Sequence, residues 1–215
     1  MSWLESLNFF EQGQRTIEKA KSRESSEYIE GFEKKEMIGN PEKSAEVWHL
    51  QEHPMSCAVA CQEFVAEELL GKEFSESKMR SYAENNAWFS DGGTKMYHVG
   101  NLLEAMGLGV ERTQGATIED LKEVLKSGGK VMVGVNNMVL ENPLYANLPG
   151  CSANHMVEVT GIDERDPRHI KVYLNDPGVK NGAGREIDLN TFQAAWKTSN
   201  TFMVSAFRQN GGKAL

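Results

Sequence analysis

The sequence predicts an α+β fold in which a helical half packs against an antiparallel β-sheet half. Apolar residues recur with helical spacing after residue 56, and from residue 130 they alternate with strand spacing. No internal repeat links the two regions. Helices first and strands second is the order typical of α+β domains. We therefore expect a site between the two halves.

The composition bounds the size and the class of partner. The 215 residues, of which 40% are hydrophobic, suit one domain or one domain with an extension. The net charge is −8 and no stretch of Lys and Arg forms a stripe, which argues against nucleic acid or an anionic membrane as a partner. No apolar run approaches the roughly 18 residues of a membrane span.

The first 46 residues form a distinct region, a helical arm ahead of a main domain over 47–210. Five apolar residues lie at its start, and a charge-dense stretch with a thin apolar face follows over 18–36. The apolar residues are Trp3, Leu4, Leu7, Phe9 and Phe10. The arm either packs on the main domain or serves as a pro-segment or a partner- or inhibitor-docking arm, and the sequence leaves these alternatives open.

The chain start and the cysteines indicate a reducing compartment. The N-terminus has no basic segment followed by a long apolar one, so no Sec signal peptide is expected. Three cysteines in a chain of this length do not suggest a disulfide framework. We expect a cytoplasmic protein, or one exported by another route, that keeps free thiols.

Periodicity and breaker residues define the expected elements. Residues 137–153 form a long loop, which is often functional inside a domain. A capping box at Thr117 and Asp120 opens one helix. The expected helices span about 57–70, 75–87, 94–106, 117–127 and 190–196. The expected strands span about 108–112, 130–136, 155–162, 169–174, 185–189 and 201–207.

Cys57 opens the first of these helices. Ser56 is a suitable N-cap residue, and Gly71 is placed to end the helix. Free N–H groups and the dipole at a helix N-terminus favour a thiolate over a thiol. Cys57 is therefore the candidate nucleophile, and it needs a base from later in the chain.

His155 is the candidate base. It begins an apolar strand directly after the long loop, which places it at a strand end beside the expected cleft. His49 and His53 lie close to Cys57 in the sequence, His98 falls in a predicted helix, and His169 follows a charged turn.

Asp176 is the candidate orienter of His155. If strands 155–162 and 169–175 pair around a turn centred near residue 165.5, residue 155 falls opposite 176. A carboxylate there would hold the imidazole and stabilise its charged form. A one-residue bulge would bring Asn175 into this place instead. Asp176 is also compatible with a plain Asp-Pro-Gly turn.

Gln51 is the candidate oxyanion donor. It is the only side-chain amide in the loop before Cys57, and it lies six residues ahead of it. The backbone N–H of Cys57 is the other expected donor.

These four residues resemble the site of papain-like cysteine peptidases. The closer similarity is to the bacterial bacteriocin-processing (double-glycine) group, family thirty-nine of the cysteine peptidases. It rests on the Gln–Cys spacing and on three further features: Gly93-Thr94 leading to His98-Val99, His155 opening a Val-rich strand, and Asp176-Pro177 ending the next strand. The resemblance covers about residues 47–207 and implies a stand-alone papain-like peptidase domain, without the transporter portions of those exporters.

One residue departs from this pattern, because Ala58 stands where the families usually have Gly. The added methyl group is expected to narrow the approach of substrate without abolishing the chemistry.

Other functions remain compatible with the same residues. The site could act as a deamidase or amidase on a partner protein, as in an effector or toxin, or could be silent in a binding module. Cys57, Cys61, Cys151 and His155 also have spacings that zinc tolerates, although tight knuckle loops are missing. The interpretation we favour is a cysteine peptidase acting on a peptide or protein, without a cofactor or metal.

Overall fold

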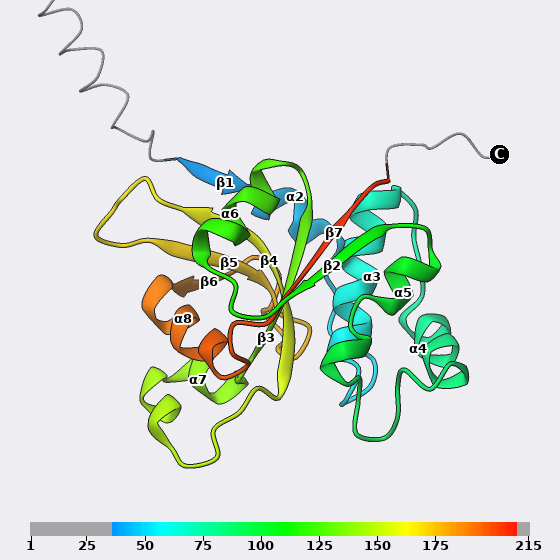
Figure 1. The fold of residues 1–215 in the computed structure, drawn as a ribbon. Helices are drawn as coiled ribbons and strands as arrows, with labels where there is room; N and C mark the ends of the chain where they lie inside the picture. Colours follow the sequence, from blue (N-terminus) through cyan, green and yellow to red (C-terminus); the bar gives the residue numbers. More distant parts are fainter. Residues whose placement is uncertain (1–35, 210–215) are drawn as a thin grey trace, which may run out of the picture. The chain divides into compact units, whose positions relative to one another are not determined.

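The computed structural model describes residues 36–209. The expectations for residues 1–35, including the apolar residues near the N-terminus, lie outside this part. Figure 1 shows a sheet-containing half beside a group of helices, in the order that the sequence predicts. The α+β fold class is confirmed.

All strand pairings of the sheet are antiparallel, and the strand order is β2-β7-β3-β4-β5-β6, with β1 paired to β4. The central strands β3 and β4 are buried almost throughout. The strands are β1 Met37–Gly39, β2 Gly109–Thr113, β3 Lys130–Val135, β4 His155–Asp163, β5 Lys171–Asn175, β6 Arg185–Asp188 and β7 Met203–Phe207.

The helices fall into two groups. The helices α3, α4 and α5 form the helical half, whereas α6, α7 and α8 lie with the sheet (Figure 1). The α-helices are α2 Pro41–Ser44, α3 Cys57–Leu70, α4 Glu76–Asn85, α5 Asn101–Ala105, α6 Ile118–Lys126, α7 Asn137–Glu141 and α8 Leu189–Lys197. The 3₁₀ turns are η1 Ala45–Val47, η2 Met96–His98 and η3 Pro143–Asn147.

The single helix predicted over 94–106 is wrong, because the chain breaks at Gly100. This residue has φ 99° and separates η2 from α5. The buried side chain of Gln62 accepts hydrogen bonds from Gly100 N at 2.8 Å and Leu102 N at 3.2 Å. These N–H groups therefore have a partner outside their own segment, so a continuous helix is not needed to satisfy them.

The predicted loop over 137–153 contains two short helical segments. Asn136 caps α7, since its side chain accepts from Met138 N at 3.0 Å and Val139 N at 3.3 Å. Asn142 caps η3 in the same way, with Pro143 at its first position. Asn at an N-cap and Pro directly after it are standard signals for the start of a helix. These two starts were not predicted.

Helix α3 packs on the sheet through a seam that runs along β4. Residues 58–66 of α3 are all buried, so this helix has no solvent-exposed face over that stretch. The Cys61 thiol lies 3.4 Å from the Met156 carbonyl oxygen of β4. Cys57 and His155 are the first residues of these two elements, and the seam brings them to the same end of the molecule.

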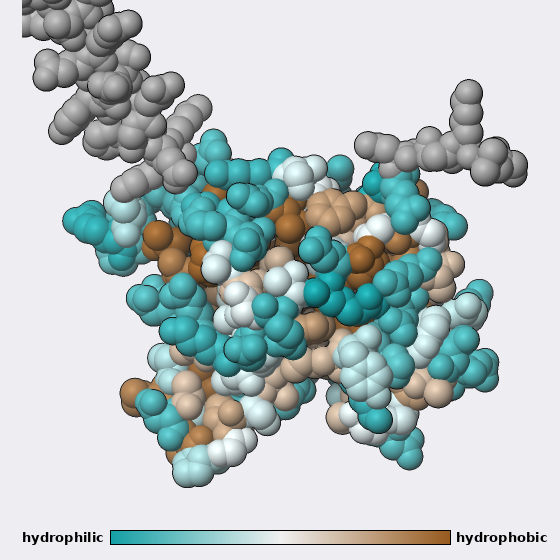
Figure 2. Space-filling model, viewed as in Figure 1, coloured by the Kyte–Doolittle hydropathy of each residue, from teal (hydrophilic) through white to brown (hydrophobic). Residues whose placement is uncertain are grey.

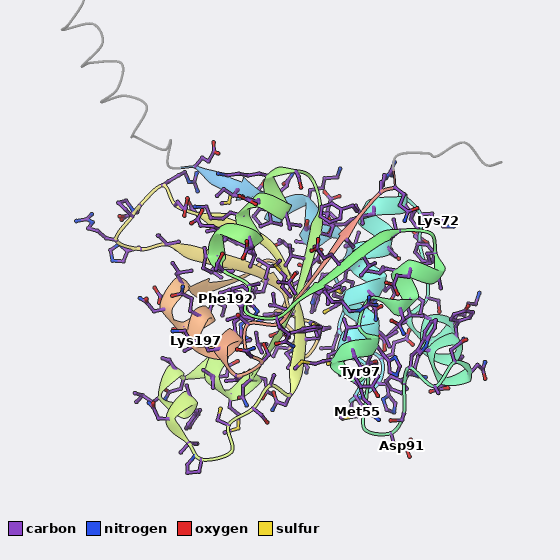
Figure 3. All side chains as sticks on the ribbon, viewed as in Figure 1. Met55, Lys72, Asp91, Tyr97, Phe192 and Lys197 are labelled. Atoms are coloured by element: carbon purple, nitrogen blue, oxygen red, sulfur yellow. The ribbon has the colours of Figure 1, made fainter. Side chains whose placement is uncertain are left out.

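The surface matches the acidic, polar composition. Hydrophilic residues cover much of the periphery in Figure 2, with hydrophobic residues toward the middle of the view. Phe192 is enclosed in the sheet half, whereas Met55, Asp91 and Tyr97 lie at one end of the helical half (Figure 3). Among the helices of residues 36–209, none has the length and apolar character to cross a membrane.

Candidate active site

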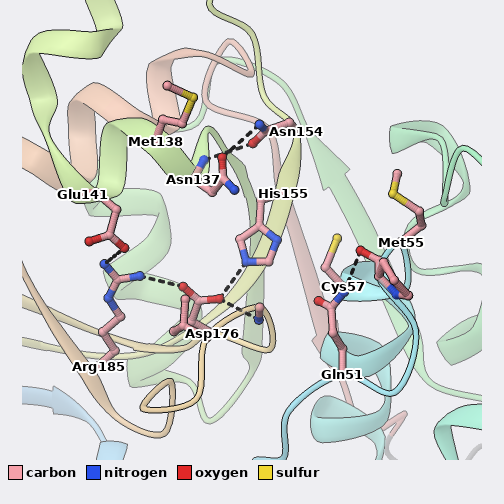
Figure 4. A pocket seen from close by; sticks show the side chains of 13 residues that line it. Gln51, Met55, Cys57, Asn137, Met138, Glu141, Asn154, His155, Asp176 and Arg185 are labelled. Atoms are coloured by element: carbon pink, nitrogen blue, oxygen red, sulfur yellow. Dashed lines mark hydrogen bonds and ion pairs between the residues drawn. The ribbon is translucent and has the colours of Figure 1, made fainter.

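One pocket of about 490 Å³ brings together the four residues that the sequence singles out. Cys57 and Gln51 line one wall, and His155 and Asp176 line the other (Figure 4). The pocket is completed by residues of the loop before α3, of α7, of the position before β4, of the turn after β5 and of the start of β6. These are Pro54, Met55, Asn137, Met138, Glu141, Asn154, Gly178, Val179 and Arg185.

Cys57 is the half-buried first residue of α3, as predicted. Ser56 occupies the N-cap position, but its hydroxyl makes no capping bond. The hydroxyl instead contacts the buried carboxylate of Glu76 on α4, which also accepts from Glu52 N at 2.8 Å. Glu76 therefore anchors the loop that precedes the cysteine.

His155 and Asp176 are in direct contact. His155 Nε2 lies 2.7 Å from Asp176 Oδ1, and their side chains are only 9% and 2% exposed. Because Nε2 contacts Asp176, the other ring nitrogen, Nδ1, remains to face Cys57 (Figure 4). Burial lowers the pKa of His155, but the hydrogen bonds and charges of Asp176 and Cys57 outweigh it and raise the pKa to about 9.

Asp176 is held ionised by its neighbours. Burial raises its pKa, but the hydrogen bond and charge of His155, the Gly178 N–H and Arg185 lower it by more, so the pKa lies below its ordinary value. The Trp48 indole N–H donates to the Asp176 carbonyl at 2.8 Å, and Asp176 N donates to the Gly182 carbonyl at 2.9 Å. Both the backbone and the carboxylate are therefore fixed.

The predicted hairpin pairs, but its predicted register is wrong by two residues. Strand β5 sets Asn175 opposite Glu158, with a bulge over 159–161. Asp176 therefore approaches His155 diagonally rather than from the directly opposite position, which long side chains can still bridge. Asn175, the alternative orienter, donates to Glu158 Oε2 at 2.9 Å instead.

Gln51 lies at the pocket, but its amide is turned into its own loop. Nε2 donates to the His53 carbonyl at 2.7 Å and to the Pro54 carbonyl at 2.8 Å, which uses both amide hydrogens. Within residues 36–209, Oε1 is buried and has no hydrogen-bond partner. The Gln51 backbone N–H donates to the Pro177 carbonyl at 2.9 Å and so ties this loop to the Asp176 turn.

A second, smaller pocket of about 180 Å³ shares Cys57 and His155 with the first. Small and apolar residues from the helical half and the sheet line it. They include Ala58, Gly92, Gly93, Thr94, Met96, Gly134, Ala153 and Met156. Ala58 is thus part of the wall beside the cysteine, although it is only 3% exposed.

A zinc site built from Cys57, Cys61, Cys151 and His155 is not formed. Within the described residues, the only convergent group of three or more metal-ligating side chains is His49, Glu63 and Glu76. His49 Nε2 lies 2.9 Å from Glu63 Oε2, and Nδ1 lies 3.9 Å from Glu76 Oε2. His49 therefore pairs with both carboxylates.

Three residues with a part in this arrangement were not predicted from the sequence: Glu76, Arg185 and Glu141. Glu76 fixes the cysteine loop, and Arg185 contacts Asp176 from a strand start. None of the three belongs to a motif, so only their tertiary placement reveals them. A Glu directly after the Ser75 N-cap is an ordinary helix start.

Comparison with known sequences gives distant relatives. No protein-family model matches the chain. Uncharacterised proteins of Mycobacterium tuberculosis and Mycobacterium bovis are 26% identical over 197 aligned residues, covering 78% of this chain and 83% of the relative.

Comparison with solved structures identifies the fold. A protein assigned as a C39-like peptidase from Bacillus anthracis aligns with a TM-score of 0.60 and 16% identity over 82% of this chain and 100% of the other. The peptidase domain of Streptococcus ComA, a bifunctional ABC transporter of a quorum-sensing pathway, aligns with a TM-score of 0.54 and 14% identity over the same shares. The chain therefore has the papain-like fold found in C39-like peptidases.

Proposed function

We propose that this protein is a cysteine peptidase whose reacting groups are Cys57 and His155, with Asp176 orienting the histidine. The observation that carries the proposal is the 2.7 Å contact of His155 Nε2 with Asp176 Oδ1 in the pocket that Cys57 also lines. Structural similarity to peptidases supports the same class.

The reaction follows from these positions. The Cys57 thiolate attacks the substrate carbonyl carbon, and His155 gives its proton to the leaving amine as the C–N bond breaks. Water then attacks the thioester while His155 takes a proton from it, and the thiolate leaves. Asp176 stabilises the imidazolium at each stage without itself accepting the proton.

The oxyanion of each tetrahedral intermediate needs donors at the start of α3. The Cys57 N–H is one, because the first N–H groups of a helix have no intrahelical partner. Gln51 supplies a second donor when Nε2 releases one of its two loop carbonyls. The unpartnered, buried Oε1 leaves this amide incompletely satisfied in its resting position, which favours such a rotation.

Alkylation tests the proposal. We expect iodoacetamide at pH 6 to label Cys57 rapidly in the intact protein, as shown by peptide mass, and we expect Cys57→Ala to abolish this fast phase. His155→Ala should slow it by about a hundredfold, the lower range for a positioned proton-transfer group. Cys151, a half-buried thiol that does not line either pocket at Cys57, is the internal control. Slow labelling of Cys57, or faster labelling of Cys151, would contradict the proposal.

Product mass identifies the reaction. A peptidase cleaves the chain of a substrate protein, whereas a deamidase adds about one dalton per converted amide without cleavage. Incubating the wild-type protein and Cys57→Ala with a denatured mixed-protein substrate should give new N-termini only with the wild type.

A further inference from the structure

The Asp176 carboxylate has two oxygens with different partners. Oδ1 accepts from His155 and, at 2.9 Å, from the Gly178 N–H. Oδ2 contacts one terminal nitrogen of Arg185, Nη1, at 2.8 Å. The group that faces the imidazole is therefore held from behind by a guanidinium.

Arg185 is itself anchored at two points. It opens β6, where it pairs with Leu174 of β5. Its second terminal nitrogen, Nη2, lies 2.7 Å from Oε1 of Glu141, the last residue of α7. The Arg185 side chain is 17% exposed, whereas the Glu141 side chain is 63% exposed. One planar side chain thus spans from the buried carboxylate to the rim of the pocket (Figure 4).

We propose that Arg185 is a positioning residue for the Cys57 reaction, in which its planar fork between Asp176 and Glu141 keeps the Asp176 carboxylate aimed at His155. The inference rests on the proposed function. A guanidinium suits this task because its donors lie in one fixed plane, whereas the lysine ammonium is a point charge on a flexible stem.

Two roles of Arg185 predict opposite changes in the pKa of His155. If Arg185 orients Asp176, removing it lets the carboxylate turn away, and the pKa of His155 falls below about 9. If Arg185 only balances charge, removing a cation behind Asp176 strengthens the field on the imidazolium, and the pKa rises. A purely structural role changes the unfolding temperature and leaves this pKa where it is.

The test measures Cys57 alkylation by iodoacetamide at pH 6 and the titration of His155 by NMR in the full-length protein. In Arg185→Met we expect at least about a tenfold loss of alkylation rate, an effect within the range of a misplaced proton-transfer group, and a lowered pKa of His155. Arg185→Lys should recover only part of the rate, because it restores the charge without the fork.

Matched variants keep the result interpretable. Arg165→Met removes an arginine that pairs with Asp163 at the exposed turn after β4, and it should leave both readouts unchanged. Glu141→Gln removes one prong and keeps the contact of Arg185 with Asp176, so it should give a smaller loss in the same direction. This variant carries the test if Arg185→Met does not fold.

The outcomes separate the two proposals. If Cys57 of the wild-type protein does not react, the proposed function fails. If Cys57 reacts and Arg185→Met stays within twofold of the wild type, or the pKa of His155 rises, only the Arg185 inference is overturned. Full rescue by Arg185→Lys also overturns it, because charge alone then suffices.

Discussion

At the scale of single residues, the site packs closely around the His155 ring. Asp176 Oδ1 lies 2.7 Å from the ring, and the turn after it brings Gly178 against the same ring. A β-carbon added at Gly178 would lie 2.9 Å from His155 Cε1 and 3.1 Å from Nε2. The missing side chain therefore makes room for the imidazole.

Gly178→Ala should impair the reaction without unfolding the protein. The new methyl group must displace the ring, so we expect about a tenfold or greater loss of Cys57 alkylation at pH 6. The change in unfolding free energy should stay below about 1 kcal/mol, because Gly178 is at the pocket rather than in the core. Gly109→Ala is the control, since its β-carbon would meet only ordinary contacts of 3.6 Å or more. Equal alkylation rates in both variants would contradict the packing argument.

The meeting of Gln51, Cys57, His155 and Asp176 at one pocket was the most predictable feature of the candidate site. Cys57 could be proposed because a helix start favours a thiolate, and His155 because a strand opens directly after a long segment. The contact of Arg185 with Asp176 could not be predicted, because an arginine at a strand start has no local sequence signal. The orientation of the Gln51 amide also depends on loop carbonyls whose directions no spacing rule gives.

At the scale of elements, the hairpin shows how a correct partner can follow from a wrong register. Asp163 pairs with Lys171 beside the turn, three residues from the pairing that a symmetric turn predicts, and the bulge between Val159 and Gly161 then shifts the register back by one. The contact survives because Asp176 lies just beyond the end of β5, where its side chain can reach diagonally. Strand existence was predictable from alternation, whereas register was fixed by the whole sheet.

The loop before α3 depends on a small group of charges at its base. Glu63 hydrogen-bonds the His49 ring and raises its pKa to about 9 against the opposing effect of burial, with help from the Leu50 carbonyl and the charge of Glu76. Glu76 in turn holds the loop through Glu52 N. The charge on His49 thus supports the segment that leads to the cysteine.

His49→Gln should remove one component of the pH dependence of stability. Because the folded-state pKa is raised above about 6.5, the stabilisation is fully present below pH 6.5 and is lost as pH rises through about 9. The ring is 37% exposed, so screening by solvent limits the effect to about 1 kcal/mol.

Urea unfolding at pH 6 and pH 10 measures this component. The wild type should lose more stability between these pH values than His49→Gln does. His169→Gln, which alters an exposed ring paired with Asp166, should behave as the wild type. Parallel losses in wild type and His49→Gln would show that this ion pair does not stabilise the fold.

At the scale of the whole molecule, a cluster of three polar side chains joins the helical half to the sheet. Glu68 comes from α3, Glu158 from β4, and Lys130 from β3, where its ammonium contacts Glu68. Within residues 36–209, one carboxyl oxygen of each glutamate is buried without a hydrogen-bond partner. Burial and the neighbouring Glu68 carboxylate raise the pKa of Glu158 well above its ordinary value, despite Lys130 and Asn175. The fold therefore favours the protonated form of the Glu158 carboxyl.

Glu158→Gln should stabilise the protein at neutral and alkaline pH. A raised carboxyl pKa favours folding most below the ordinary glutamate pKa, and this contribution is lost as pH rises through the folded-state value. Glutamine keeps a neutral donor and acceptor without this cost. The melting temperature of the variant should exceed that of the wild type at pH 8 by more than at pH 5.

The surface variant Glu186→Gln, at an exposed pair with Lys171, serves as the control for the loss of one carboxylate. Its melting temperature should follow that of the wild type at both pH values. If Glu158→Gln also follows the wild type, Glu158 is not held neutral in the fold.

The division into helical and sheet halves was predictable because periodicity changes along the chain, and the long apolar helix α3 was the clearest element. The short elements α7 and η3 were not predicted, since their five residues each are too few for periodicity to register. Helix α7 nevertheless lines the pocket, through Asn137, Met138 and Glu141.

The contact of the Cys61 thiol with the Met156 carbonyl has a consequence for how such a protein can diversify. The contact lies one helical turn after Cys57 in α3 and one residue after His155 in β4. The spacing between the Cys57 thiol and the His155 imidazole is therefore set by how closely α3 packs on β4. Met138 of α7, by contrast, lines the same pocket with an exposed side chain that takes no part in the Arg185 contacts with Asp176 and Glu141. Under the proposed function, substitutions at Met138 would change the surface that meets a substrate and leave the spacing of Cys57 and His155 to the core.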